Sequence, residues 1–196
     1  MASNRHLGRV IVLQSLYEYE FRSKAGDASA DIDSIVAKNI EPYEKALGDV
    51  DFVHDLTHGV FDEMEELDKE LQPMAPEWPI SSISSIDRNV LRIGLFELTR
   101  HKDQVPPKVA INEAVELAKA FGSDNSSKFI NGVLGTAYRN IGGEDNKKHA
   151  ESEKSKEEAT PAKTESEEPA EEAEETSSEL AEKTRAELAD LDDLDI

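Results

Sequence analysis

The amino-acid sequence predicts an all-α fold, a compact bundle of six or seven helices followed by a disordered acidic tail. Apolar residues recur at three- and four-residue steps through most of residues 10–138, which is the spacing of one face of a helix. No stretch shows the sustained alternation of apolar and polar residues that marks a half-buried strand. After Gly142 and Gly143 the composition changes to an acidic segment without aromatic residues.

The first helix is expected near the N-terminus. Ser3 is a suitable N-cap residue. After it, Val10, Leu13, Tyr17 and Phe21 follow one another at helical spacing. We expect this stripe to be the apolar face of the first helix, which the segment KAGDASAD then ends.

Two more helices are expected before residue 80. One apolar stripe runs from Ile32 to Tyr43 and stops at Gly48. A longer stripe covers residues 53–71 and predicts a single long helix. The following segment QPMAPEWP contains three prolines within seven residues, which ends any helix there.

Three helices complete the predicted bundle. The segment SSIDRNVLRIGLFELTR opens with serine caps and continues at helical spacing. Pro107 suits the first turn of the next helix, whose apolar stripe ends at Phe121. Gly122 is a good residue to follow a helix C-terminus. The last helix is expected to carry the apolar residues between Phe129 and Tyr138.

The domain boundary is placed at residue 143, with a helical domain in 1–143 and an acidic tail in 144–196. Residues 151–196 contain 5 basic and 18 acidic residues, a net charge of −13 out of −21 for the chain. Such a segment buries too little apolar surface to offset its ordering entropy, so we expect it to be disordered. Leucines between Leu180 and Leu194 also permit a short acidic amphipathic helix. A solubilising tail is the simpler interpretation.

Composition and motifs argue against several classes of protein. There is no cysteine, which excludes disulfides and thiolate metal sites. No apolar run approaches the ~20 residues of a membrane span, and no signal peptide is evident, so a cytoplasmic protein is expected. The sequence has no GxxxxGK[ST], GxGxxG or HExxH motif. His54 and His58 have metal-compatible spacing but lack further specified ligands. We therefore expect no enzyme activity, cofactor or metal.

Two local patches favour RNA binding. Arg5, His6 and Arg9 place positive charge at a helix start, where the helix dipole is itself positive, and a phosphate partner would explain that placement. The alternative is an N-terminus without a binding role. Taken alone, the first helix favours this alternative.

The second patch is the segment FGSDNSSKFING, residues 121–132. A helix start offers backbone N–H groups to phosphate, and Lys128 adds positive charge. Asn125 and its serine neighbours can bond sugars or base edges, and Phe129 can stack on an unpaired base. The alternative is that Ser123 or Asp124 only caps the helix and Phe129 belongs to the core.

Three segments together resemble the NusB family of transcription antitermination factors. They are RHLGRVIVLQSLYEYE, DRNVLRIGLFELT and VPPKVAINEAVELAKAFGSDNSSKFINGVLG, and the resemblance covers roughly residues 3–141. It implies an all-helical fold of two packed halves. It also implies binding of boxA-type single-stranded RNA together with NusE, a small-subunit ribosomal protein. The resulting complex joins the elongating RNA polymerase and supports transcription of ribosomal RNA operons.

The resemblance also implies site residues. The RNA surface would comprise Arg5, Arg9, Tyr17, Asp124, Asn125, Lys128 and Phe129. The NusE-facing surface would include Glu97, whose carboxylate can meet a basic group of the partner.

Two departures from the family pattern shape our expectations. The N-terminus has only two arginines and a histidine in its basic segment, so we expect RNA affinity to depend on NusE. The acidic tail has no counterpart in the family, and we expect it to compete with RNA for the basic patch. Two alternatives remain open: a protein-interaction scaffold that works through the tail, and a stand-alone relative of the RNA-binding domain of ribosomal RNA cytosine methyltransferases.

Overall fold

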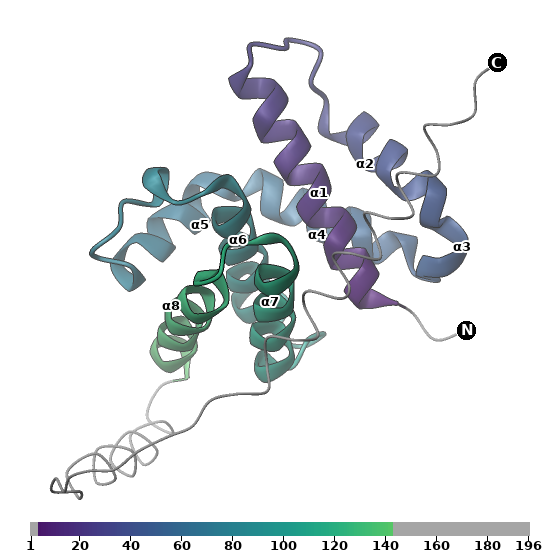
Figure 1. Cartoon of the computed structure of the whole chain (residues 1–196). Helices are drawn as coiled ribbons and strands as arrows, with labels where there is room; N and C mark the ends of the chain where they lie inside the picture. Colours follow the sequence, from purple (N-terminus) through teal and green to yellow (C-terminus); the bar gives the residue numbers. More distant parts are fainter. Residues whose placement is uncertain (1–3, 143–196) are drawn as a thin grey trace, which may run out of the picture. The chain divides into compact units, whose positions relative to one another are not determined.

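The computed structural model describes residues 4–142, which fold into eight α-helices without a strand (Figure 1). Seven of these helices have eight or more residues, so the predicted all-α fold is confirmed. Ser3 and the predicted tail lie outside the described residues. The helices are α1 (Arg5–Lys24), α2 (Ile32–Ile40), α3 (Glu44–Leu47), α4 (Val50–Asp62), α5 (Met64–Leu71), α6 (Ser85–Thr99), α7 (Pro107–Phe121) and α8 (Ser126–Ile141). Short 3-10 turns lie at Glu41–Tyr43, Gln72–Met74 and Ile80–Ser82.

Side-chain caps explain where four of the helices begin. Asn4, Asp31, Asp49 and Ser84 each accept a hydrogen bond from the backbone N–H three residues later, at 3.1, 2.9, 3.1 and 3.1 Å. These bonds satisfy N–H groups that have no partner inside the helix. α7 begins at Pro107 as predicted, where the missing N–H of proline costs nothing.

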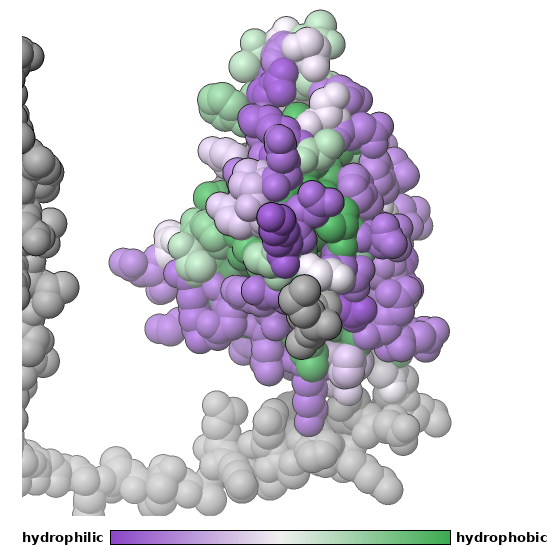
Figure 2. Space-filling model, turned by 90° about the vertical axis from the view of Figure 1, so that its right-hand side faces the viewer, coloured by the Kyte–Doolittle hydropathy of each residue, from purple (hydrophilic) through white to green (hydrophobic). Residues whose placement is uncertain are grey.

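The helices form two halves that meet at α6. α1, α2 and α4 pack together in the first half, and α6, α7 and α8 in the second. α1 and α4 also contact α6 (Figure 1). Every residue of α6 from Asp87 to Leu98 is buried, so this helix is the shared centre of the fold. The face in Figure 2 is mostly hydrophilic, with apolar side chains gathered in patches near its middle.

Two sequence-based expectations about helices are wrong in detail. The expected single helix over residues 53–71 is divided at Glu63, whose backbone has φ −104° and ψ 13°. No proline or glycine marks this break. The Glu63 carboxylate instead accepts a hydrogen bond from Arg100 Nε at 2.9 Å, a contact between residues 37 positions apart that sequence periodicity does not encode.

The buried face of α1 also differs from the expected one. Ile11, Val12 and Leu16 are the fully buried apolar residues of this helix, whereas Tyr17 and Phe21 are 40% and 63% exposed. α1 therefore has apolar residues on two faces. Part of the stripe that we expected in the core, Tyr17 and Phe21, therefore lies at the surface.

The loop between α5 and α6 is held by two polar side chains. Gln72 Nε2 donates to the carbonyl oxygen of Trp78 at 3.2 Å, and its Oε1 accepts from Ile80 N at 3.1 Å. Arg88 Nη1 donates to the carbonyl oxygens of Ile80 and Ile83, both at 3.3 Å. These bonds fix the backbone around Trp78, while its indole is exposed.

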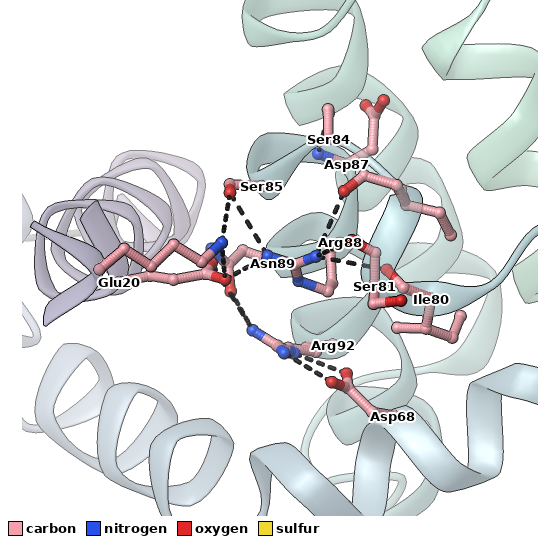
Figure 3. A network of polar contacts seen from close by, with 12 residues as sticks. Glu20, Asp68, Ile80, Ser81, Ser84, Ser85, Asp87, Arg88, Asn89 and Arg92 are labelled. Carbon is pink, nitrogen blue, oxygen red and sulfur yellow. Dashed lines mark hydrogen bonds and ion pairs between the residues drawn. The ribbon is translucent and has the colours of Figure 1, made fainter.

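A polar network joins α1 and α5 to α6 (Figure 3). Arg92 donates through Nε and Nη2 to the two carboxylate oxygens of Asp68, both at 2.7 Å. Asn89 Nδ2 donates to Glu20 Oε2 at 3.1 Å, and Arg88 forms an ion pair with the same carboxylate. Because Glu20 lies near the end of α1, this network sets the position of α1 on α6.

Two opposing effects act on Glu20. Burial raises its pKa, but the hydrogen bond from Lys24 and the charge of Arg88 outweigh burial, so the pKa lies below its ordinary value of 4.5. A carboxyl whose pKa is lower in the folded state stabilises the fold above its unfolded pKa. That contribution is lost as the pH falls through the folded pKa.

We expect Glu20→Gln to lower the free energy of unfolding at pH 7 and to flatten its decline below about pH 4.5. Urea denaturation between pH 3 and pH 7 measures both effects. Glu116→Gln is the matched control, because Glu116 is exposed and, among residues 4–142, pairs only with Lys119 one turn away. A Glu20→Gln curve parallel to that of the unmodified chain would contradict the role given to this network.

Candidate nucleic-acid interface

The turn between α7 and α8 is tight because glycine permits a close approach. A Cβ atom on Gly122 would lie 2.5 Å from Ser126 Cβ and 2.6 Å from the carbonyl oxygen of Ala118. Ser126 Oγ, which is buried, accepts a hydrogen bond from Ser123 N at 2.8 Å. The turn is thus fastened by Ser126. Neither Ser123 nor Asp124 acts as the N-cap, a position taken by Asn125 without a side-chain bond.

The side chains of this turn differ in how far they reach solvent. Asp124, Asn125 and Lys128 are exposed, and Phe129 is half-buried against the core. Within residues 4–142 Lys128 forms no ion pair with any described carboxylate. The turn therefore presents one available cation, one carboxylate and one amide, with part of an aromatic ring behind them.

α1 contributes a cation and an aromatic side chain. The guanidinium of Arg5 is exposed, lies 5.0 Å from the centre of the Phe52 ring, and has Nη2 3.5 Å from Asp49 Oδ2. Tyr17 stacks against Phe21 with ring centres 6.3 Å apart and 15° between the ring planes. Exposed aromatic faces of this kind can stack on unpaired bases.

An apolar groove of about 190 Å³ connects α1 to the end of α7. We call it the α1–α7 groove. It is lined by Val10, Leu13, Gln14, Tyr17, Ile86 and Phe121. Phe121 is the last residue of α7, so the groove brings Tyr17 of α1 beside the end of α7, directly before the turn. The groove therefore joins one predicted RNA residue, Tyr17, to the residue that precedes the predicted turn, 104 positions further along the chain.

The groove contains a residue that the site prediction omitted. Phe121 is 44% exposed, although its spacing assigned it to the apolar face of its helix. Phe21, the stacking partner of Tyr17, was also omitted. The sequence did contain a signal for the two omitted residues. α1 has more apolar residues than one buried helix face can hold, because Ile11, Val12 and Leu16 come in addition to the predicted stripe. Some apolar residues of α1 must therefore lie at the surface.

Arg9 and Glu97 are buried and paired with each other. This differs from the expectation that Arg9 contacts RNA and that Glu97 contacts the partner protein. Arg9 Nε donates to Glu97 Oε2 at 2.9 Å and Nη2 to Oε1 at 2.7 Å. Their side chains are only 3% and 1% exposed. Because α1 packs its first turns against α6, the arginine enters the interior, where a charge needs an opposite and hydrogen-bonded partner.

Glu113 of α7 extends this ion pair toward the surface. Its Oε2 lies 3.7 Å from Arg9 Nη1 and 2.8 Å from His6 Nδ1. Three helices are thus connected through the first two turns of α1. This cluster occupies the Arg9 guanidinium and leaves it unavailable to a ligand.

The two histidines of α4 lie close together. The rings of His54 and His58 stack with centres 6.2 Å apart, and His58 Nε2 lies 3.1 Å from Asp33 Oδ1. Within residues 4–142 no group of three or more potential ligands can hold a metal ion. In the same range, no helix combines the length and the apolar character needed to cross a membrane.

Comparison with known proteins decides the family. Residues 6–139 match the model of the NusB family. The chain belongs to the NusB family. The transcription antitermination protein NusB of Dehalococcoides mccartyi (strain CBDB1) is 42% identical over 140 residues, which is 71% of this chain and 92% of that protein. NusB of Roseiflexus sp. (strain RS-1) is 43% identical over 137 residues, covering 69% and 92%.

Solved structures agree with the fold. NusB of T. maritima superposes with a TM-score of 0.62 at 30% identity, over 71% of this chain and 93% of that one. A NusB chain solved with NusE and double-stranded RNA gives a TM-score of 0.58 at 23% identity, over 69% and 96%. At this lower identity the likeness concerns the fold alone.

We expect Arg9→Met to lower the free energy of unfolding by about 3–5 kcal/mol, because it leaves the Glu97 carboxylate buried without a partner. The double variant Arg9→Met/Glu97→Met should lose much less than the sum of the two single variants. Urea denaturation of all four chains completes the cycle. Arg5→Met serves as a surface control, with an expected change of about 0–1 kcal/mol. Additive losses would contradict direct coupling of the pair.

Proposed function

We propose that this NusB-family chain is an RNA-binding transcription antitermination factor that holds boxA-type RNA without chemically changing it. One observation carries the proposal beyond family membership: the α1–α7 groove places an exposed tyrosine beside a turn with an available lysine. A cation that meets phosphate and an aromatic face that stacks on a base are the two elements of single-strand recognition.

The surface residues take different roles in this proposal. Arg5 and Lys128 contact phosphates, and Tyr17 stacks on an unpaired base. Asp124 and Asn125 bond sugars or base edges. Phe129 packs partly against the core and offers its exposed part to RNA.

We further propose that the chain acts with NusE in the elongating RNA polymerase complex of the bacterial cytoplasm. Its support is the family and the existence of a complex of NusB, NusE and double-stranded RNA among proteins of the same fold. Only two described cations, Arg5 and Lys128, are assigned to phosphate. We therefore expect weak RNA binding by the chain alone and stronger binding with NusE.

The decisive experiment measures binding of a boxA-type RNA oligonucleotide and of NusE, separately and together, by fluorescence anisotropy and calorimetry. The proposal expects a ternary complex tighter than either binary one. Binding of NusE with no effect of RNA would identify a protein-interaction scaffold instead. Absence of both interactions would overturn the proposal.

We expect Lys128→Ala to weaken boxA RNA binding and to reduce the slope of log affinity against log salt by about 0.7–1, the effect of one lost phosphate contact. Lys102→Ala removes the same charge from an exposed position in the loop between α6 and α7 and is the matched control. Circular dichroism checks that both variants keep their helices. Equal effects of the two substitutions would show only a general dependence on charge and would reject the assigned contact.

A further inference from the structure

Ser126 is a buried hydroxyl residue at the end of an exposed turn. Its side chain is only 2% exposed, whereas Asp124 and Asn125 directly before it are exposed. A side chain buried this deeply does not reach RNA itself, so Ser126 can serve recognition only through its neighbours. Burying a hydroxyl costs free energy unless the group is hydrogen-bonded, and its partners therefore indicate its role.

Ser123 and Ser126 close the turn by two reciprocal hydrogen bonds. Ser126 N donates to the carbonyl oxygen of Ser123 at 2.9 Å, and Ser123 N donates to Ser126 Oγ at 2.8 Å. The two hydroxyl oxygens lie 3.0 Å apart. Between them, Asn125 has φ −100° and ψ −7°, close to the values of the third residue of a type I turn. Asp124 and Asn125 are therefore held by a backbone bond and a side-chain bond at once.

Gly122 makes room for the side-chain bond. A Cβ atom on Gly122 would lie 2.5 Å from Ser126 Cβ and 2.6 Å from Ser126 Oγ, well inside the roughly 3.5–4.0 Å at which nonbonded carbon atoms pack best. Ser126 thus occupies space that a side chain at position 122 would need. The closed turn depends on these two residues together.

We propose that Ser126 is a positioning residue for RNA recognition, which holds Asp124 and Asn125 in the conformation that meets the ligand. The inference rests on the proposed function, because those two residues are assigned there to sugars or base edges. Among the described residues, the Asn125 side chain caps no N–H group of α8, so its amide is available to a ligand. When the bond from Ser123 is lost, the turn opens more often. The apparent affinity then falls with the fraction of molecules in which the turn is closed.

The closure of the turn is tested first without RNA, with Ser126→Ala in the full-length chain. This variant removes only the hydroxyl, so circular dichroism should show unchanged helicity. We expect the Ser123 amide to exchange its hydrogen about two- to tenfold faster, because one hydrogen bond has been lost. The amide of Gly122, which donates to the carbonyl oxygen of Ala118 at 2.9 Å, should keep its rate. Unchanged exchange at Ser123, measured by NMR, would overturn the closure.

Binding of a boxA-type RNA oligonucleotide tests the positioning itself. Ser126→Ala should weaken binding by about two- to tenfold. Because no cation is removed, the loss should be the same at every salt concentration, with an unchanged slope of log affinity against log salt.

Thr57→Ala is the matched control for the loss of a buried hydroxyl. Thr57 is fully buried on α4 and donates to the carbonyl oxygen of Val53 at 2.7 Å, so its removal should lower stability and leave RNA affinity unchanged. Equal losses of affinity in Thr57→Ala and Ser126→Ala would indicate a general effect of destabilisation and overturn the positioning role. Unchanged affinity of Ser126→Ala would overturn it as well.

A double-mutant cycle tests whether Ser126 acts through the two turn residues. In a chain that already carries Asp124→Ala/Asn125→Ala, adding Ser126→Ala should weaken binding by less than about twofold. An undiminished loss in that background would overturn the proposal. If the unmodified chain binds neither RNA nor NusE, the proposed function and the positioning role that rests on it both fail. Faster exchange at Ser123 would still establish the closure of the turn.

Discussion

Burying the charged side chains of α6 is the constraint on which the arrangement of this fold depends. Arg88, Arg92 and Glu97 all lie in the interior, and each needs a partner because an unpaired buried charge is costly. α1 supplies two of those partners, Glu20 toward its end and Arg9 in its second turn. The two halves of the molecule are therefore joined by specific pairs as well as by apolar packing, and only one position of α1 satisfies both pairs.

That position determines the surface available for recognition. With Arg9 and Leu16 facing inward, α1 turns Tyr17 and Phe21 toward solvent. The same orientation aligns Tyr17 with Phe121 at the end of α7 across the α1–α7 groove. A binding face with cationic and aromatic components thus follows from internal charge pairing. Residues of the interior shape the face without touching a ligand themselves.

The sequence was sufficient to predict most helices and the breaks between them. It was not sufficient to predict the roles of all charged residues. Periodicity, Pro107 and the prolines after Leu71 located helices and breaks, because these signals are local. The expected roles of Arg9 and Glu97 failed because the two residues are 88 positions apart, and neither periodicity nor charge reveals such a pair. The exposed side of α1 was misassigned for a related reason: with apolar residues on two faces, spacing alone does not determine which one meets α6.

The loop between α5 and α6 has a practical consequence for spectroscopy. The chain contains a single tryptophan, and its indole already lies in water while Gln72 holds the backbone beneath it. The tryptophan emission of the native protein consequently originates from one solvated indole on a well-anchored stretch of backbone, remote in sequence from α1 and α8. This emission changes when a quencher or a partner reaches the loop. It responds little to a loss of packing in the hydrophobic core.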